Sequence, residues 1–494
     1  MQRPLRLAAL LWIATACTAS PARREGAPPN VLILYTDDQG YGDCGAYNDD
    51  PRLQTPNLDR LAAEGMRFLD AHSSGSVCTP SRYGLLTGRY AWRTERGDVV
   101  LGADAEVLIE PGRVTLASLL RDHGYRTAAV GKWHLGMRIP GTKGNRDWTQ
   151  PVEDGPLQRG FDEFYGIPAS MNFGVLTWFD GAHAVEPATL WTRKKFPASE
   201  IETKPFDYRM APPFDEERLN KSDIEVAPGF RDVDALAIIA EHAVAFLERA
   251  AEQPDQPFFL YVPFTSPHLP HCTAPDFQGR TQLGNYGDFL LETDARIGAI
   301  LSALDRGGLS ENTLVVFSSD NGPENNRADW QRIYGHDPSG GFRGGKRDLY
   351  EGGHRVPLLV RWPNVVRPGS SFDGAVGQVD LLRTVADALG AELPRDAGED
   401  SVSFLPALRG EEHRREVPLV HRAGKRAALR SGRYKLHRYP GKDGDGRRLE
   451  LYDLDSDPGE RENLAGHHPE RVEDLERRLE QLLGHPDPVQ SSSD

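Results

Sequence analysis

The sequence predicts an α/β fold, with a large, mostly parallel or mixed sheet sandwiched by helices and a small C-terminal α+β subdomain. Two observations lead to this prediction. Short apolar runs rich in β-branched and aromatic residues alternate with segments of helical spacing, as in sheets covered by helices on both faces. The chain has 494 residues, more than a single hydrophobic core usually accommodates, which favours a second, smaller unit.

Buried strands and helices are predicted in alternation along the first part of the chain. Five short apolar runs have the length and composition of buried strands: 31–35, 127–130, 258–262, 314–317 and 356–362. Three segments carry apolar residues at helical spacing: 116–123, 233–247 and 289–304. Thr115 and Gly124 flank the first of these segments and are typical of a helix N-cap and a helix stop. This alternation predicts the large sheet.

From about residue 405 the pattern changes to short antiparallel strands joined by turns. Strands are predicted at 427–430, 434–436 and 449–454, and a charged helix at 469–483. We therefore divide the chain into a large unit at 28–404, a small subdomain at 405–486 and a disordered tail at 487–494. Two segments rich in Pro, Lys and Glu are predicted as long insertions near the sheet edge: 138–156 and 184–230.

The first 22 residues have the pattern of an export signal. Arg3 and Arg6 precede an apolar run at 7–16 that is too short to span a bilayer. The Ala14-Thr15-Ala16 triplet suits ordinary signal cleavage, whereas the same stretch followed by Cys17 also satisfies a loose lipobox, so lipidation of Cys17 stays open. We expect an exported protein, periplasmic or extracellular, with membrane attachment only through such an anchor.

Composition restricts the partners of the protein. Charged residues make up 27% of the chain and the formal net charge is −15. An acidic surface argues against nucleic acid as a partner, because phosphate binding needs clustered Lys and Arg. An anionic ligand would therefore have to be captured by local cations rather than by the overall field.

The chain has four cysteines: Cys17, Cys44, Cys78 and Cys272. A disulfide between Cys44 and Cys272 would be available in an oxidising compartment. Two unpaired buried thiols are the alternative that we favour.

Polar clusters follow four of the predicted strands, at the point where each strand ends. They are Asp37-Asp38, Lys132-Trp133-His134, Ser266-Pro267-His268 and Asp320-Asn321-Gly322. Ligands of open α/β sheets bind beyond the carboxyl ends of the strands. If the strands are parallel, these four segments meet at one edge of the sheet and form a site.

A metal site is predicted among these clusters. Asp37, Asp38, Asp320 and Asn321 offer only oxygen ligands, which hard cations such as calcium or magnesium prefer. Each pair alone is more typical of a helix cap or a turn. Together they favour a cation, which also explains how neighbouring carboxylates can coexist in the ionised state.

Residues 78–89, CTPSRYGLLTGR, carry the most specific motif. Cys78 with Pro80, Ser81 and Arg82 resembles the cysteine that type I sulfatases, members of the alkaline phosphatase-like superfamily, oxidise to formylglycine. The resemblance runs from about Asn30 to the end and is strongest to bacterial arylsulfatase-like members. Further segments similar to the family follow in its order: 55–61, 131–136, 267–268, 319–322 and 344–353.

The resemblance implies roles for the residues that match family positions. Asp37, Asp38, Asp320 and Asn321 would hold a divalent cation, usually Ca²⁺ with Mg²⁺ as the alternative, and the formylglycine at position 78 would complete its shell. Arg82 would stabilise the hydrated aldehyde, and Lys132 and Lys346 would neutralise sulfate oxygens. His134 would contact a hydroxyl of the hydrate, and His268 would bind and protonate the leaving alcohol. Ser170 matches a weaker family position near the sulfate.

The implied activity is release of inorganic sulfate from an aryl or carbohydrate sulfate ester. One hydroxyl of the hydrated aldehyde attacks sulfur, and the second then expels sulfate and restores the aldehyde. The resemblance also implies a sulfated small molecule or glycan and a formylglycine-generating maturation enzyme as partners. Two alternatives are a phosphonate or phosphate ester hydrolase of the same superfamily and a catalytically silent binder of sulfated glycans.

Two residues near these motifs are not part of the family pattern. Arg347 follows Lys346 where many relatives carry a small residue, which adds positive charge near or beyond the sulfate. Cys44 lies soon after Asp38 in sequence. Both leave substrate preference open and do not change the implied reaction class.

Overall fold

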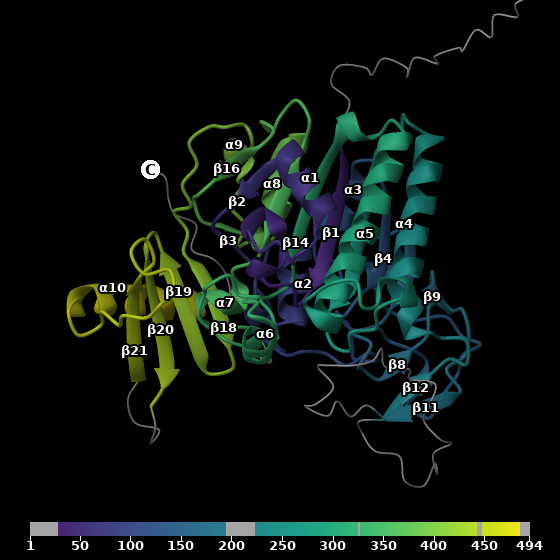
Figure 1. Ribbon diagram of the computed structural model, residues 1–494, viewed down its shortest axis with the longest axis horizontal. Coiled ribbons are helices and arrows are strands. Elements are labelled where there is room, and N and C mark those ends of the chain that lie inside the picture. Colours follow the sequence, from purple (N-terminus) through teal and green to yellow (C-terminus); the bar gives the residue numbers. More distant parts are fainter. Residues whose placement is uncertain (1–27, 194–222, 325–326, 442–446, 485–494) are drawn as a thin grey trace, which may run out of the picture.

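The computed structural model describes residues 28–193, 223–324, 327–441 and 447–484. It shows a large sheet covered by helices and, beside it, a smaller sheet with one helix on its outer side (Figure 1). The predicted export signal with Cys17 and the predicted tail at 487–494 lie outside the described residues. Among the described residues, no helix is long and apolar enough to cross a membrane.

The large sheet has ten strands and is mixed, as the sequence predicts. In spatial order they are β10 (His183–Ala184), β9 (Phe179–Asp180), β7 (Glu163–Ile167), β4 (Arg126–Lys132), β13 (Phe258–Pro267), β1 (Asn30–Asp37), β14 (Thr313–Ser319), β15 (Leu358–Arg361), β2 (Met66–Phe68) and β16 (Ser370–Phe372). Strands β7, β4, β13, β1 and β14 run parallel to their neighbours in this block, whereas β15 is antiparallel to β14. These five parallel strands therefore end at the same edge, and among them are β4, β13, β1 and β14, which the predicted polar clusters follow.

Alternate residues of β1 enter two hydrophobic cores, one on each face of the sheet. Val31 and Ile33 belong to one cluster, and Leu32 and Leu34 belong to the other, as the two-residue period of a strand requires. One face is covered by α1 (Pro56–Glu64), α4 (Ala235–Ala251) and α5 (Gly284–Arg306). The other face is covered by α2 (Cys78–Thr87), α3 (Leu116–Asp122) and α8 (Leu381–Leu389). Apolar burial on both faces explains why these strands read as continuous apolar runs.

The predicted helices at 116–123, 233–247 and 289–304 are confirmed as α3, α4 and α5, the last beginning earlier, at Gly284. The Oγ1 atom of Thr115 accepts the Ser118 N–H at 3.0 Å and caps α3. The insertion at 138–156 holds the short hairpin β5 (Gly141–Thr142) and β6 (Asn145–Arg146). The described part of 184–230 adds β11 (Leu190–Arg193) and β12 (Asp223–Val226), which pair beside β8 (Val175–Leu176).

Helix α1 is anchored to α5 by a buried carboxylate. The side chain of Asp294 accepts the N–H groups of Leu58 at 2.9 Å and Asn57 at 3.1 Å, and the Asn57 side-chain amide at 2.7 Å. It thereby satisfies N–H groups that the first turn of α1 leaves without helical partners. Burial nevertheless raises the pKa of Asp294 to about 6, because desolvation outweighs these hydrogen bonds.

This carboxylate should make stability fall as pH rises. The folded pKa lies above the unfolded value of about 3.9, so the stabilisation by the protonated form is complete below about pH 4 and is lost as pH rises through about 6. Two pKa units correspond to about 3 kcal/mol at most. Urea unfolding from pH 4 to 8 should therefore show a flatter profile for Asp294→Asn than for the parent. Asp387→Asn, at an exposed position of α8, is the control, and parallel profiles for Asp294→Asn and the parent would contradict the expectation.

The C-terminal sheet contains β18 (Leu419–Ala423), β19 (Arg426–Ser431), β20 (Tyr434–Pro440) and β21 (Arg447–Asp453), antiparallel in chain order. Helix α10 (Pro469–Gly484) packs Leu475 and Leu479 against the strand residues Leu429 and Leu436. The predicted strands and helix are confirmed, whereas β18 was not predicted. Its sequence, LVHRA, has only two adjacent aliphatic residues before the charged ones. The division at residue 405 stays a prediction.

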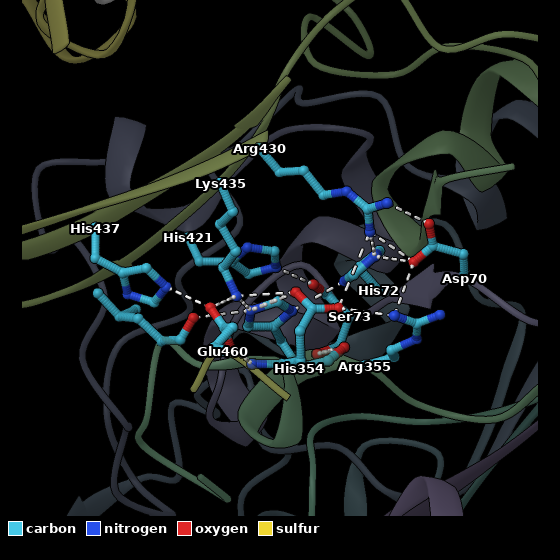
Figure 2. Close-up of polar contacts among 12 residues, drawn as sticks. Asp70, His72, Ser73, His354, Arg355, His421, Arg430, Lys435, His437 and Glu460 are labelled. Atoms are coloured by element: carbon cyan, nitrogen blue, oxygen red, sulfur yellow. Dashed lines mark hydrogen bonds and ion pairs between the residues drawn. The ribbon is translucent and has the colours of Figure 1, made fainter. Parts of the chain in front are cut away.

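Buried charges join the second sheet to the large unit (Figure 2). Lys435 Nζ lies 2.9 Å from the Glu351 carboxylate of α7 (Glu351–His354), and Arg430 Nη1 lies 2.6 Å from Asp70. His421 Nε2 donates to the main-chain oxygen of Ser73 at 2.9 Å. Removing one partner of a buried ion pair typically costs about 3–5 kcal/mol. We call this set the interface network, and it holds β18, β19 and β20 in one position relative to the large sheet.

Candidate functional site

Side chains from four parallel strand ends converge, as the sequence predicts. Asp37 is the last residue of β1 and Lys132 the last of β4. His268 directly follows β13, and Asp320 directly follows β14. All four are buried. The site therefore lies at the carboxyl edge of the central block of the sheet.

Helix α2 brings Cys78 to the same point. Cys78 is its first residue, and Arg82 lies one turn later on the same side. Arg82 donates to Asp320 Oδ2 from Nη2 at 2.7 Å and from Nε at 3.1 Å. The ligand atoms of Asp37, Cys78 and Asp320 lie within 4.8 Å of one another. Cys78 is thus part of the carboxylate cluster.

The donor set fits a hard cation. Asp37 Oδ1 and Asn321 Oδ1 are buried oxygens without a hydrogen-bond partner, and buried polar atoms are rarely left so. Asp38 also lies in the cluster, with its Oδ1 accepting the Asn321 amide at 2.7 Å. Carboxylate and amide oxygens are the ligands that Ca²⁺ and Mg²⁺ prefer. Asp37, Asp38, Asp320 and Asn321 could therefore hold a divalent cation together with a group at position 78.

Three cations balance the three carboxylates. Lys132 Nζ lies 2.5 Å from Asp37, Lys346 Nζ lies 2.7 Å from Asp38, and Arg82 pairs with Asp320. Burial, with Asp37 nearby, raises the pKa of Asp320 to about 6, and burial also raises the pKa of Asp38. Adding a divalent cation would leave these groups with a net charge of +2. Such a site attracts an anion.

Two site residues have strained backbones. The φ angles of Asp38 and His134 are 66° and 54°, in the left-handed region that costs a non-glycine residue about 1 kcal/mol or more. The N–H of Asp38 donates to Asp320 Oδ1 at 3.1 Å, which fixes the turn at the end of β1. The strain lets Asp37 and Asp38 both contribute to one cluster, although successive strand residues point to opposite faces.

The two histidines differ in which nitrogen carries the proton. His134 Nε2 lies 3.1 Å from the carbonyl oxygen of Leu101, which can only accept, so Nδ1 is left as a buried acceptor without a partner. His268 Nδ1 lies 2.5 Å from the carbonyl of Leu269, and its Nε2 faces Asp38 at 3.7 Å. Burial and the nearby lysines hold the pKa of both imidazoles well below its usual value. Both rings are therefore neutral around pH 7 in this charge state.

The remaining predicted residue, Ser170, lies three residues beyond β7, which pairs in parallel with β4. Its Oγ is buried and has no hydrogen-bond partner. Two residues near the site were missed by sequence reasoning. Phe173 packs edge-on against the His134 ring with centroids 4.9 Å apart, and Glu324 lies 3.7 Å from Lys346 Nζ. Neither has a local signature, although Glu324 follows the 320–322 cluster closely.

The other described cysteines are buried thiols outside any disulfide, as favoured from the sequence. Cys44 packs among the apolar residues between α1 and the sheet, and burial raises the pKa of its thiol far above the usual range. Cys272 Sγ lies 3.4 Å from an oxygen of Asp232. Within the described residues the two thiols form no disulfide.

Comparisons with known proteins agree with this geometry. The family model described as Sulfatase matches residues 29–391, and the model for the C-terminal part of N-sulphoglucosamine sulphohydrolase matches residues 341–485. The N-acetylgalactosamine-6-O-sulfatase of Bacteroides thetaiotaomicron is 32% identical, with 98% of this chain and 99% of the relative covered. Human arylsulfatase A is 33% identical over 96% of this chain and 89% of its own length. One similar solved structure belongs to work on the metabolism of multiple glycosaminoglycans by B. thetaiotaomicron. It is 31% identical to this chain, has a TM-score of 0.79, and covers 93% of this chain and 100% of the other.

A mixed sheet whose carboxyl edge combines oxygen ligands, buried cations and a helix-borne cysteine defines an alkaline phosphatase-like hydrolase. The chain belongs to the sulfatase family. It is thus an enzyme that hydrolyses sulfate esters, and its substrate is a sulfated molecule. The fold, the family and the reaction class predicted from the sequence are confirmed.

Proposed function

We propose that this sulfatase uses formylglycine made from Cys78, together with a bound Ca²⁺, to release sulfate from a carbohydrate or aryl ester. The observation that carries the proposal is the placement of the Cys78 sulfur within 4.8 Å of ligand atoms of Asp37 and Asp320. Burial raises the pKa of the Cys78 thiol, whereas the thiols that act as nucleophiles in enzymes have a lowered pKa. This favours a modified residue at position 78.

Asp37, Asp38, Asp320 and Asn321 would hold the cation, and Mg²⁺ is the alternative ion. The cation would polarise sulfate oxygens, and the aldehyde at position 78 would supply, once hydrated, the oxygen nucleophile. Arg82 would orient residue 78 from one turn further along α2, while its guanidinium stays paired with Asp320. These assignments rest on the oxygen donor set and on the two unpartnered oxygens, of Asp37 and Asn321.

The substrate sulfate would bind where positive charge is concentrated. Lys132 and Lys346 are buried and supply two of the cations. The N-terminus of α2, with Cys78 as its first residue, adds the positive end of a helix dipole. Ser170 Oγ, buried and without a partner, is available as a further donor to a sulfate oxygen. Charge that develops on sulfate in the transition state would be stabilised by groups already in place.

The two histidines would move protons on opposite sides of the reaction. The free Nδ1 of His134 would accept a proton from the second hydroxyl of the hydrated aldehyde at position 78. His268 would protonate the leaving oxygen from Nε2, because its Nδ1–H is already directed to the carbonyl of Leu269. His268 must therefore become an imidazolium, and the negative charge of a bound sulfate would offset the lysines that lower its pKa.

Maturation and export belong to the same proposal. A formylglycine-generating enzyme would act on the motif around Cys78, and residues 1–22 would direct export to the periplasm or cell exterior. Attachment to a membrane would occur only through a lipid on Cys17. The domain division at residue 405 would separate the catalytic unit from a subdomain that packs on it through the interface network.

Hydrolysis of 4-nitrophenyl sulfate compared with 4-nitrophenyl phosphate tests the reaction class in the purified protein. We expect a higher kcat/KM for the sulfate, because the chain belongs to the sulfatase family. The formylglycine content of the preparation is measured first, by mass spectrometry of the peptide that contains Cys78. A clear preference for phosphate would favour the phosphoesterase alternative, and full activity with an unmodified cysteine would refute the proposed nucleophile.

A further inference from the structure

The tip of the β18–β19 hairpin reaches one wall of the active site. Arg426 Nη2 donates to the main-chain oxygen of Arg347 at 3.1 Å. Arg347 follows Lys346, and its own N–H donates to the Ser76 oxygen at 2.8 Å, two residues before Cys78. The hairpin therefore contacts the segment that carries Lys346. This segment in turn contacts the loop that leads to Cys78.

The same hairpin also approaches a second wall. Arg422 Nε lies 3.7 Å from Asp98 Oδ2. Asp98 lies three residues before Leu101, whose oxygen receives the His134 Nε2 hydrogen bond and whose N–H donates to Thr79 Oγ1 at 3.2 Å. Since Thr79 adjoins Cys78 in sequence, the hairpin spans the region between two segments that both contact the catalytic residues.

This arrangement concentrates positive charge beside the site. We call Arg347, Arg422, Lys425 and Arg426 the basic rim. The Arg347 and Arg422 side chains are 51% and 39% exposed, and Lys425 is exposed. Glu324 pairs with Arg347, and Asp98 faces Arg422. Four cations against these two carboxylates leave a local excess of positive charge in a chain whose net charge is −15.

The rim is held in a fixed position. His421, at the centre of β18, donates to the Ser73 oxygen, and Arg430 of β19 pairs with Asp70, both within the interface network (Figure 2). Arg347 has a φ angle of 74°, an unfavourable conformation for a non-glycine residue that its surroundings must maintain. Groups fixed in place before binding lose less entropy when a ligand arrives.

From this geometry we infer that the basic rim binds a second anionic group of the substrate, beyond the sulfate that is cleaved. The preferred substrate is then a polyanionic glycan, with further sulfates or carboxylates on neighbouring sugars, rather than a neutral aryl or sterol monosulfate. This inference rests on the proposed function of the site. Complementary charge at the entrance also accelerates the encounter with such a substrate in a protein whose overall charge would repel it.

Charge reversal at the rim tests the inference. The double variant Arg422→Glu/Lys425→Glu and the single variant Arg347→Gly, in which glycine suits the observed φ angle, are compared with the parent enzyme. The control is Arg477→Glu on the exposed side of α10, where Arg477 pairs only with Asp474 among the contacts of the described residues. Substrates are 4-nitrophenyl sulfate, with one charge, and a panel of chondroitin 6-sulfate, heparin and carrageenan oligosaccharides.

We expect the parent to cleave at least one oligosaccharide with a higher kcat/KM than 4-nitrophenyl sulfate. For that oligosaccharide, the double variant should reduce kcat/KM, relative to the aryl sulfate, by about tenfold or more, because two charges that attract the second anion become repulsive. Arg347→Gly should act in the same direction, and Arg477→Glu should leave the ratio unchanged. The effect should shrink at high salt.

Repeating the assay with a carboxyl-reduced oligosaccharide identifies the second anion. If the rim variants still reduce the relative kcat/KM, the second anion is a sulfate. If they no longer do, it is a carboxylate. The inference is wrong if no oligosaccharide exceeds the aryl sulfate or if the rim variants leave the ratio at the parental value. Failure to cleave any sulfate ester, the aryl sulfate included, in a preparation that contains formylglycine would instead refute the proposed function.

Discussion

Cys78→Ala is expected to reduce sulfate ester hydrolysis by a factor on the order of 10⁴ or more, since loss of the proposed covalent nucleophile would remove the reaction path itself. Cys78 is buried at the start of α2, and alanine is a good helix former that removes only the end of the side chain at position 78. The loss of stability should be about 1 kcal/mol. Turnover of 4-nitrophenyl sulfate and thermal unfolding are measured on the same preparation.

The chain provides a matched control for this prediction. Cys44→Ala truncates an equally buried side chain, one that packs among apolar residues away from the ligand cluster. It should lose a similar amount of stability and keep its activity. Activity of Cys78→Ala near the parental rate would overturn the assignment of residue 78.

Removal of the divalent cation should have the second largest effect. Treatment with a chelator is expected to abolish activity, and added Ca²⁺ should restore it. Changing a residue that only supports a metal ligand typically weakens metal affinity by about 10–100-fold. Because Asp37 would be a ligand itself, Asp37→Asn should weaken the apparent Ca²⁺ affinity by at least that much. Asparagine has nearly the shape of aspartate, so the affinity changes mainly because one negative charge is lost.

The readouts for this experiment are activity and melting temperature across a Ca²⁺ titration. Asp294→Asn, a buried change on α5, is the control and should respond to Ca²⁺ as the parent does. Chelator-resistant activity would show that the carboxylate cluster serves another purpose. A titration curve of Asp37→Asn that coincides with that of the parent would exclude Asp37 as a ligand.

The cluster at the carboxyl edge of the sheet could be predicted from the sequence because each of its strand-end residues directly follows or ends a recognisable apolar run. Buried parallel strands are continuous apolar runs, and the polar residue after each run marks its end, so Asp37, Lys132 and Asp320 could be placed together from topology alone. Their pairing could not be predicted. Which lysine meets which aspartate depends on the strained turns at Asp38 and His134, and tertiary contacts maintain these turns.

The contribution of the second sheet could not be predicted for a related reason. β18 has a weak strand pattern, and its contact between His421 and Ser73 joins residues 348 positions apart. The interface network draws single residues from several separate segments, so no stretch of sequence contains its signature. Arg347 was recognised as unusual beside Lys346, but its link to the hairpin at Arg426 appears only in the folded chain.

The interface network also limits how this enzyme can be divided. A second sheet that lacked Arg430 and Lys435 would leave the buried carboxylates of Asp70 and Glu351 to share Arg355, which contacts both. Each uncompensated buried charge costs several kcal/mol, and a typical domain has only about 5–15 kcal/mol of stability in total. The small sheet therefore does not behave as an interchangeable module. Grafting it from another sulfatase would require the charges on both sides of the junction to be exchanged together.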